Sequence, residues 1–190
     1  RLFDIFFSLI VILFILSWLI PLLGILIKLE SKGTIFFKQS RPGIYEEEFI
    51  CYKFRSMKLN GTTESEASRN DPRVTKIGRF IRKTSIDELP QFFNVLLGEM
   101  SVVGPRPHLW AQNKTYGKKI KKYMVRHHIK PGITGLAQVK GCRGEIETED
   151  DMVNRIKFDV FYIENWSFLM DFKIILQTVI NIFKGDEKAY

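Results

Sequence analysis

LFDIFFSLIVILFILSWLIPLLGILI (residues 2–27) sets the architecture of this chain, because Asp4 carries the only charge in this long apolar run. As a helix with a rise of 1.5 Å per residue, the run is roughly 39 Å long, which is enough to cross a bilayer. It is too long for the apolar core of a secretory signal peptide, and no small-residue cleavage site follows it. Hydropathy alone therefore favours one ordinary transmembrane helix.

Two features of the run instead favour a bent helix that enters and leaves the bilayer by one face. Pro21 lies well inside the run, where its ring removes a backbone hydrogen bond and bends the axis. Basic residues flank both ends, Arg1 before the run and Lys28, Lys32 and Lys38 after it. The charge bias therefore does not assign the two ends to opposite sides of the membrane, and both arrangements stay open at this point.

The rest of the 190-residue chain is long enough for one domain with its own core. Residues 34–39 and 48–57 are rich in aromatic and β-branched residues, and the turn signal SRPGIYEE between them predicts a β-hairpin. Residues 59–73 are polar and turn-rich, which predicts a loop. Helical patterns resume near Val74 and at 89–97. We therefore expect a mostly helical α+β domain.

A second apolar helix is predicted near the C-terminus, where large apolar residues recur at helical spacing. They are Phe168, Phe172, Ile175, Leu176, Val179 and Phe183. A stripe of this kind usually packs on a core. In a chain that also has an apolar N-terminal run, it equally suits an amphipathic helix lying at the bilayer interface.

Charge is strongly segregated along a chain whose net charge is +8. Residues 100–144 contain seven Lys, three Arg and no acid, whereas EIETEDD (145–151) has five acids. Such a basic chain suits acidic partners: nucleic acid, anionic lipid or phosphorylated substrates. KTYGKKIKKYMVRHHIK (114–130) is expected to be a basic helix or loop, either on anionic headgroups or simply solvated. It has no regular interleaving of aromatic residues, with only Tyr116 and Tyr123 in the stretch, and no standard nucleic-acid motif, which argues against nucleic acid.

The segments on either side of the basic stretch, SVVGPRPHL (101–109) and IKPGITGLAQV (129–139), are punctuated by Gly and Pro and predict loops. Cys51 and Cys142 are far apart and give no disulfide framework. The three histidines show no zinc-ligand spacing, and His127 and His128 are expected on a polar face.

The stretch SIDELPQFFNVL (85–96) places two adjacent acids, Asp87 and Glu88, before an apolar helix. Ser85 and Glu88 have capping-box spacing, but a helix that begins at Ser85 would put Pro90 beyond the first turn, where it removes a backbone bond. A helix that begins at Asp87 places Pro90 harmlessly inside the first turn and Asp87 at the helix mouth, where anions and metals gather. The pair alone does not distinguish these alternatives.

Four motifs together resemble one family: YKFRSM (52–57), RFIRKTSIDELPQFFNVLLGEMSVVGPRP (79–107), PGITGLAQV (131–139) and FDVFYIENWSFLMDFKII (158–175). They are similar to the bacterial sugar transferases, the monotopic polyprenyl-phosphate phosphoglycosyl transferases, over nearly the whole chain. GCRGEIETEDDMVNRIKFDVFYIENWS and the terminal KGDEKAY look most like the undecaprenyl-phosphate glucose phosphotransferases that begin exopolysaccharide repeats. Larger relatives carry an additional N-terminal region, so the chain is expected to be one functional unit that can form the C-terminal part of a longer protein.

The resemblance implies that Asp87 and Glu88 form a catalytic dyad. Asp87 would attack the β-phosphorus of a UDP-sugar, expel UMP and hold the sugar-1-phosphate covalently until undecaprenyl phosphate takes it. A carboxylate can carry a phosphoryl group in this way and so divides one transfer into two steps. The family's metal is Mg²⁺, which the resemblance assigns to Asp87.

The resemblance also implies which basic residues bind phosphate or substrate: Arg82 and Arg106, and in the YKFRSM motif Lys53 and Arg55. Donor and acceptor would be UDP-glucose and undecaprenyl phosphate, with downstream glycosyltransferases as further partners. A homo-oligomer is compatible with the family, and no nucleic acid is expected.

For the membrane, the resemblance implies a re-entrant helix over residues 1–28, broken at Pro21, and a cytoplasmic catalytic domain over residues 29–190 at the bacterial inner membrane. Family members often have Ser directly before this proline, whereas this chain has Ile20, with Ser17 one turn earlier. Ser can satisfy a backbone carbonyl freed at a kink.

Three other functions are each compatible with part of the sequence: a membrane-tethered nucleic-acid binder, a non-catalytic assembly scaffold and a two-carboxylate glycosidase. An intact acidic dyad argues against the scaffold. Neighbouring residues on a helix point about 100° apart and do not flank a glycosidic bond as glycosidase acids do.

Overall fold

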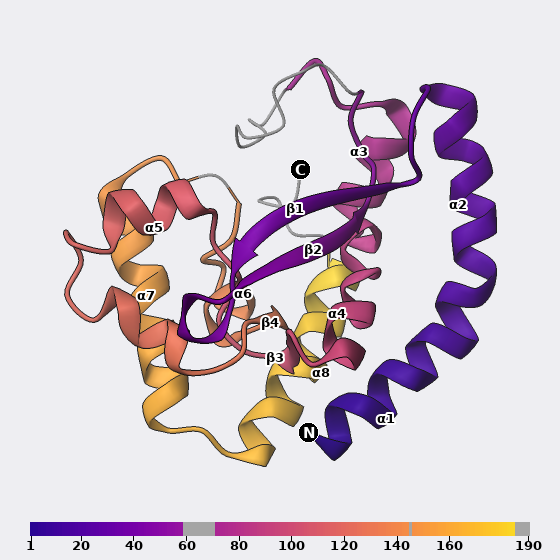
Figure 1. Cartoon of the computed structure of the whole chain (residues 1–190). Helices are drawn as coiled ribbons and strands as arrows, with labels where there is room; N and C mark the ends of the chain where they lie inside the picture. Colours follow the sequence, from indigo (N-terminus) through magenta and orange to yellow (C-terminus); the bar gives the residue numbers. More distant parts are fainter. Residues whose placement is uncertain (59–70, 145, 185–190) are drawn as a thin grey trace.

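The computed structural model describes residues 1–58, 71–144 and 146–184 (Figure 1). This part of the chain is α+β and mostly helical, as predicted. The loop expected over residues 59–73 lies outside the described residues except for its last three positions, and so do Glu145 and residues 185–190.

The apolar run forms one helical path with a wide turn in its middle, made of α1 (Leu2–Val11), the π-helical segment η1 (Ile12–Leu16) and α2 (Ser17–Glu30). The path curves along one side of the molecule (Figure 1). Pro21 lies inside α2, so the irregular hydrogen bonding comes before the proline, not at it. The physical reason is that Pro21 has no N–H for the carbonyl four residues earlier and its ring crowds that carbonyl, which lies directly after η1.

Side chains satisfy carbonyls around this wide turn. Ser17 Oγ donates to the Leu13 carbonyl at 2.6 Å, and Trp18 Nε1 donates to the Phe14 carbonyl at 2.8 Å. Ser17, one turn before Pro21, thus satisfies a backbone carbonyl near the bend, which is the role expected of a serine directly before the proline.

The first end of the apolar helix is tied to the rest of the fold by its two charged residues. The Arg1 guanidinium donates to the carbonyls of Val95 (2.6 Å) and Leu96 (2.8 Å), which lie at the end of α4 (Gln91–Leu97). The Asp4 carboxylate accepts from the backbone N–H of Val102 at 3.0 Å. These contacts hold the beginning of the helix against the polar body of the protein.

The second end is held by the same body. Glu30 accepts from the N–H groups of Lys76 (2.6 Å) and Ile77 (2.9 Å), which are unpaired donors at the start of α3 (Lys76–Lys83). Arg55 donates to the carbonyls of Ser31, at 2.7 Å, and Lys32, just after α2 ends.

The predicted hairpin is confirmed. β1 (Phe36–Pro42) pairs antiparallel with β2 (Glu48–Phe54), from Phe36 opposite Phe54 to Pro42 opposite Glu48, and η2 (Ile44–Glu46) connects the two strands. Helix α3 packs directly on the segment after β2, because a Cβ on Gly78 would lie 1.9 Å from the Ser56 carbonyl oxygen.

The two Gly/Pro segments predicted as loops also contain a small parallel sheet. β3 (Ser101–Val103) pairs with β4 (Gly132–Thr134), and α6 (Leu136–Val139) follows. The approach is close, since a Cβ on Gly132 would lie 2.1 Å from the Gly104 nitrogen. The prediction of loops alone was wrong because three-residue strands that pair across some thirty residues have no local periodicity to reveal them.

The remaining elements build the side of the molecule away from α2 (Figure 1) and its lower edge; they are α5 (Trp110–Tyr116), η4 (Tyr123–His128), α7 (Glu149–Glu164) and α8 (Phe168–Lys184). The basic stretch is thus a short helix and a 3₁₀ segment joined by a turn. His127 is buried and bonded to Asn113 and the Gly43 carbonyl, so its expected place on a polar face was wrong, whereas His128 is exposed.

Helix α8 does not pack as an ordinary core helix. Among its described residues only Ile174 is buried, and five of the six stripe residues are exposed: Phe168, Phe172, Leu176, Val179 and Phe183. Core packing as an explanation of the stripe is therefore wrong. At its start α8 touches the apolar N-terminal helix, since the ring of Phe168 meets that of Phe3 edge-on at 5.5 Å.

Candidate active site

The two acids lie in a single 3₁₀ turn, η3 (Ile86–Glu88), immediately before α4. The N–H of Glu88 donates to the Ser85 carbonyl and that of Leu89 to the Ile86 carbonyl, both at 3.2 Å. Pro90 then stands at the N-cap of α4, where its missing N–H costs nothing. Neither helix start considered from the sequence is the observed one.

Ser85 has a structural role other than the predicted capping box. Its backbone is left-handed, with φ 57°, and its side chain caps no helix N–H. A non-glycine residue in this region is strained and is usually held there by its surroundings. Here the Arg143 guanidinium donates to Ser85 Oγ at 3.0 Å. The turn that presents both acids is thus held from outside the local sequence.

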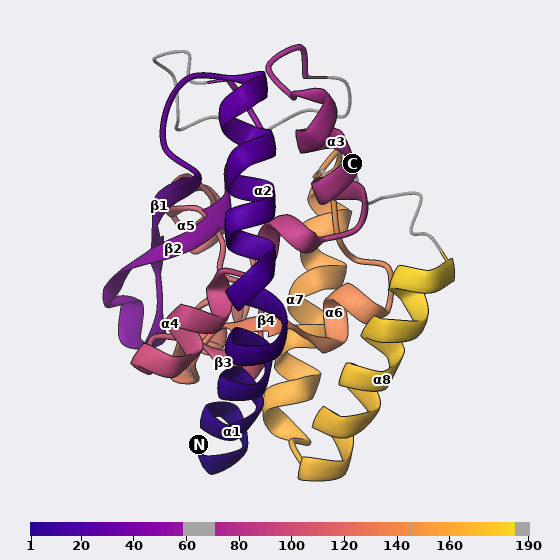
Figure 2. The ribbon, with the colours of Figure 1, turned by 90° about the vertical axis from the view of Figure 1, so that its right-hand side faces the viewer.

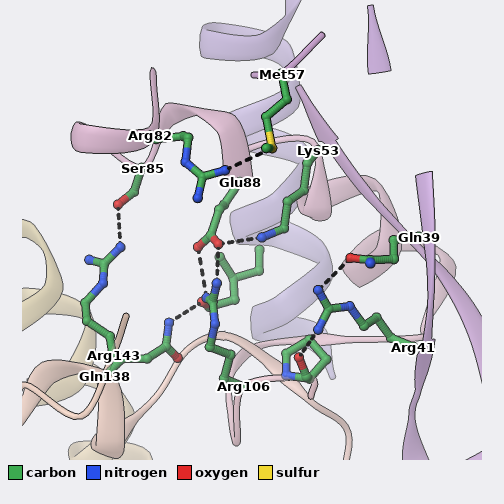
Figure 3. A network of polar contacts seen from close by, with 12 residues as sticks. Gln39, Arg41, Lys53, Met57, Arg82, Ser85, Glu88, Arg106, Gln138 and Arg143 are labelled. Atoms are coloured by element: carbon green, nitrogen blue, oxygen red, sulfur yellow. Dashed lines mark hydrogen bonds and ion pairs between the residues drawn. The ribbon is translucent and has the colours of Figure 1, made fainter. Parts of the chain in front are cut away.

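Glu88 is held by two cations that come from different elements (Figure 3). Lys53 Nζ in β2 lies 2.7 Å from Glu88 Oε1, and Arg106 reaches both carboxylate oxygens, with Nη2 at 2.6 Å and Nη1 at 3.2 Å. Burial by itself would raise the pKa of Glu88, but Arg106 and Lys53 outweigh it and hold the pKa well below the ordinary value. Glu88 is therefore a fixed negative charge.

Asp87 is held differently, although it is as buried as its neighbour, both residues being 8% exposed. In the part of the chain that the structure describes, its carboxylate takes part in no hydrogen bond or ion pair. Burial and then the charge of Glu88 raise the pKa of Asp87 to about 6, and Lys53, Arg82 and Arg106 offset this only in part. Of the two acids, Asp87 is thus the one whose carboxylate has no partner among the described residues.

The other predicted basic residues divide into two groups. Arg82, in the last turn of α3, lowers the pKa of Asp87 through its positive charge. Its guanidinium donates to Met57 Sδ at 3.7 Å (Figure 3). Arg55 is not among the groups that hold the two acids. Its guanidinium binds the Ser31 and Lys32 carbonyls after α2 and so anchors the end of that helix, and its expected role in substrate binding stays a prediction.

Arg143 is a site residue that the sequence did not single out. Its charge lowers the pKa of Glu88, and its guanidinium holds Ser85 (Figure 3). It follows Gly141 and Cys142 in a loop of the acid-free stretch, a position in the sequence that it shares with Arg106 and Arg126 and that does not single it out.

The residues fit a magnesium ion that is bound mainly through substrate. The described residues contain no group of three or more His, Cys, Asp and Glu side chains that could hold a metal. Mg²⁺ is usually bound by one or two carboxylates together with substrate phosphates, and it keeps several waters. Both oxygens of Glu88 face cations, whereas the Asp87 carboxylate is open to such a ligand.

Asp87→Asn is expected to stabilise the metal-free protein near neutral pH. A carboxyl whose folded-state pKa is raised contributes stability that is fully present below the unfolded pKa and is lost as pH rises through the folded pKa of about 6. Removing the buried charge should therefore raise the free energy of unfolding at pH 7.5 by about 2–3 kcal/mol, at roughly 1.4 kcal/mol per pKa unit. Thermal unfolding in a chelator, at pH 7.5 and at pH 4, measures the gain and its disappearance.

Glu88→Gln is the matched control, because the pKa of Glu88 is shifted in the opposite direction. A lowered pKa contributes stability above the unfolded value that is lost as pH falls, so this variant should be less stable than the parent at pH 7.5. Equal destabilisation by both substitutions would contradict the different electrostatic environments of the two acids.

Comparison with known proteins places this site in a family. The family model of the bacterial sugar transferases matches residues 1–185. The UDP-glucose:undecaprenyl-phosphate glucose-1-phosphate transferase of Escherichia coli (strain K12) is 49% identical over 92% of this chain, and that of Klebsiella pneumoniae is 49% identical over 94%. The chain spans 37% and 39% of the length of these two relatives.

A shorter relative matches from end to end. The exopolysaccharide production protein PSS of Rhizobium leguminosarum bv. phaseoli is 43% identical over 95% of this chain and 93% of its own length. With a family match over nearly all of its residues and relatives at this level of identity, the chain belongs to the bacterial sugar transferase family.

Proposed function

We propose that this chain is the catalytic unit of a phosphoglycosyl transferase that moves hexose-1-phosphate, with glucose as the first choice, from a UDP-sugar to undecaprenyl phosphate. The names of the Escherichia coli and Klebsiella pneumoniae relatives state this activity for those proteins. The observation that supports this proposal for this chain is that two adjacent buried acids have different electrostatic environments. Glu88 is neutralised by Lys53 and Arg106, whereas Asp87 has no hydrogen-bonding partner among the described residues.

The first half-reaction uses Asp87 as the nucleophile. One carboxylate oxygen attacks the β-phosphorus of the UDP-sugar, the bond from this phosphorus to the bridging oxygen breaks, and UMP leaves with the electron pair. The raised pKa makes Asp87 a better nucleophile than an ordinary aspartate while leaving it ionised above about pH 6. The second half-reaction restores the carboxylate when an oxygen of undecaprenyl phosphate attacks the same phosphorus.

Fixed positive charge must surround this phosphorus, because two anionic substrates and a carboxylate repel one another. Lys53, Arg82 and Arg106 all lower the pKa of Asp87 through their positive charge, and they are therefore near enough to stabilise negative charge on a phosphate bound there. Mg²⁺, held by Asp87 and substrate phosphates, would neutralise the diphosphate when bound. Glu88 keeps Lys53 and Arg106 together beside the nucleophile.

The way in which the apolar helix is attached supports a re-entrant helix over residues 1–28 and a catalytic domain over 29–190 on the cytoplasmic face of the inner membrane. The helix Leu2–Glu30 is long and apolar enough to cross a membrane. However, Arg1 and Asp4 at one end and Glu30 at the other bind the same polar body. A helix that crossed the bilayer would separate its ends by roughly 30 Å of hydrocarbon, and the attachment of both ends to one polar body favours a re-entrant helix instead.

Large apolar residues are exposed along the whole length of this helix, whose course past the rest of the molecule is shown in Figure 2. They include Phe6, Leu13, Phe14, Trp18, Leu22, Ile25 and Leu29. The exposed stripe of α8 adjoins the first turns of this helix through the contact of Phe168 with Phe3. Surfaces of this extent on a protein mark membrane or protein contacts, and here they suit a half-immersed helix with an amphipathic helix beside it.

The lysines between α5 and η4 do not share this surface. Lys118, Lys119, Lys121 and Lys122 are exposed, but the turn that carries them lies on the side of the molecule opposite α1 and α2 (Figures 1 and 2). The headgroup contact considered from the sequence therefore does not fit this arrangement. We expect neutralising these lysines to leave membrane association unchanged.

UDP-glucose should be the preferred donor, with UDP-galactose second. The test is UMP release from a panel of UDP-sugars in the presence of undecaprenyl phosphate and Mg²⁺. Faster turnover of an N-acetylated donor would contradict the choice of sugar. Release of free sugar without UMP would contradict phosphoglycosyl transfer itself and favour a glycosidase.

Both ends of the apolar helix should be accessible from the cytoplasm. Cysteines introduced by Leu2→Cys and Lys32→Cys are expected to react with a membrane-impermeant thiol reagent only after the cells are opened. Pro21→Leu should straighten the helix and shift a fraction of molecules towards spanning, because it restores a backbone donor and removes the ring's clash. Labelling of Leu2→Cys in intact cells would instead establish an ordinary transmembrane helix.

Downstream glycosyltransferases and a second copy of the chain remain the proposed protein partners.

A further inference from the structure

The loop that carries Arg106 is held through its carbonyl groups. Gly104–Pro107 reads GPRP, and two of its four residues have no N–H to donate. The Pro105 carbonyl accepts from the N–H of Gly132 at 2.9 Å, and the next two carbonyls accept from arginine side chains. Arg126 Nη2 donates to the Arg106 carbonyl at 2.5 Å, and Arg41 Nη1 donates to the Pro107 carbonyl at 3.1 Å. Three consecutive carbonyls thus fix the backbone of this loop.

Arg126 is itself fixed from a third element. The same Nη2 that binds the Arg106 carbonyl donates to Asp159 Oδ2 at 3.0 Å, and both charged side chains are only 2% exposed. The guanidinium also lies over the ring of Tyr123, with its carbon 5.6 Å from the ring centre. A chain of contacts therefore runs from Asp159 in α7 through Arg126 to the backbone of Arg106, and from the Arg106 guanidinium to Glu88.

This arrangement is poorly explained by stability alone. A buried ion pair gains little over well-packed apolar residues of similar size, because removing two charges from water offsets most of their attraction. Two further nitrogens of Arg126, Nε and Nη1, are buried without a hydrogen-bonding partner in the described structure, which adds to its cost. What the guanidinium does supply is a donor that fixes a carbonyl inside a proline-rich loop.

We propose that Arg126, held by Asp159, is a positioning residue that sets the place of Arg106 against Glu88. The effect of this positioning on UMP release rests on the proposed function. Its effect on the structure of the Gly104–Pro107 loop does not. A long arginine side chain reaches both oxygens of Glu88 only if its backbone is held, and a displacement of about 1 Å in an active site can cost about 100-fold in rate.

The first test replaces the buried pair as a unit, Arg126→Met together with Asp159→Leu, so that neither charge is left alone. The paired variant should fold and unfold at a temperature close to that of the parent. UMP release should fall about 30–100-fold, mainly in kcat, because the substrate-binding surface is retained while the charge beside Asp87 is misplaced. Unchanged turnover in the folded variant would overturn the proposal.

The matched control removes another ion pair between the same two parts of the chain. Lys122, directly before η4, and Glu164, at the end of α7, are 2.7 Å apart and about half exposed. Lys122→Met with Glu164→Leu should leave UMP release unchanged, since this pair does not touch the Arg106 loop. An equal loss of UMP release in the control would show that any weakening of the η4–α7 contact lowers activity. It would contradict a specific positioning role for Arg126.

A double-mutant cycle separates positioning from general damage. If Arg126 acts through Arg106, the paired replacement should cost nothing further in an Arg106→Ala background. Losses that multiply in the combined variant would show that the two residues act independently and would overturn the proposal. If the paired variant does not fold, Arg126→Lys takes its place in the cycle, because it keeps the charge opposite Asp159 but loses the planar guanidinium.

Hydrogen exchange tests the loop without any reference to activity. The N–H of Gly104 donates to the Thr134 carbonyl and that of Gly132 to the Pro105 carbonyl, both at 2.9 Å. These two amides should exchange faster in the paired variant than in the parent or the control. Unchanged exchange would overturn the positioning role. If these amides exchange faster in the paired variant but the parent releases UMP from no UDP-sugar, the positioning role of Arg126 is upheld and the proposed function is rejected.

Discussion

Asp87→Asn is expected to accept no label from a UDP-sugar radiolabelled in its sugar and to lose at least about 10⁴-fold in UMP release, because it removes the nucleophile of a covalent mechanism. The parent protein with Mg²⁺ and without lipid acceptor should retain sugar-1-phosphate on the chain and release one UMP for each active site. Asparagine matches aspartate in size, and the Asp87 carboxylate makes no hydrogen bond within the described structure that the substitution would break. The variant should therefore fold.

Two comparisons make this result specific. Chelation of the metal should abolish labelling of the parent, since the cations of the chain alone leave the diphosphate only partly neutralised during attack. Glu88→Gln should still accept some label, because Glu88 holds Lys53 and Arg106 and does not itself attack. If Asp87→Asn folds and turns over at the parent rate, the covalent mechanism is wrong and the two acids only terminate a turn.

Arg106→Ala should have the second-largest effect, a loss of about 100- to 1,000-fold in UMP release measured in detergent. Truncating one partner of a hydrogen-bonded charge pair that is fully buried costs about 2–5 kcal/mol, whereas this pair is only partly buried, with Arg106 29% exposed. About 1.4 kcal/mol corresponds to a factor of ten. Without Arg106, Lys53 is the one direct ion-pair partner that Glu88 keeps among the described residues. The pKa of Glu88 should rise towards its ordinary value, and the pKa of Asp87 should rise further, because Arg106 lowers both.

The control for charge is an exposed cation away from the site, and Lys119→Ala should leave the rate unchanged. Arg82→Ala is expected to fall between the two, because Arg82 lowers the pKa of Asp87 but is not one of the two cations paired with Glu88 in the described structure. A rate for Arg106→Ala equal to that of Lys119→Ala would place the phosphate contacts elsewhere in the molecule.

Several elements could be predicted because the interactions that form them are local. The apolar run gives the helix Leu2–Glu30, and the two aromatic segments on either side of a turn signal give the hairpin β1–β2. The stripe at 168–183 gives α8. In each case the residues that share backbone hydrogen bonds lie in one continuous stretch of the chain, at most 18 positions apart in the hairpin (Phe36 opposite Phe54), so periodicity and turn residues suffice.

Elements that depend on distant partners could not be predicted in this way. The parallel pairing of β3 with β4 joins Ser101 to Gly132, and no pattern within either segment indicates the other. The exposure of α8 was equally undetermined, since the same stripe serves a core or a membrane surface. The wide turn at Ile12–Leu16 was missed because the sequence indicates the proline but not which turn of the helix accommodates it.

The candidate site shows the same division most clearly. The residues of the dyad are adjacent in the chain, and their spacing to Pro90 already indicated an unusual helix start. Their different chemistry depends on groups far away in sequence, with Lys53 35 positions and Arg106 18 positions from Glu88. Hydrogen bonds and Coulomb interactions fall off with distance in space, whatever the separation along the chain. Local spacing therefore left the role of the two acids open until the family resemblance suggested a dyad, and only the packing of β2, the GPRP loop and η4 around them made one a fixed charge and the other a free carboxylate.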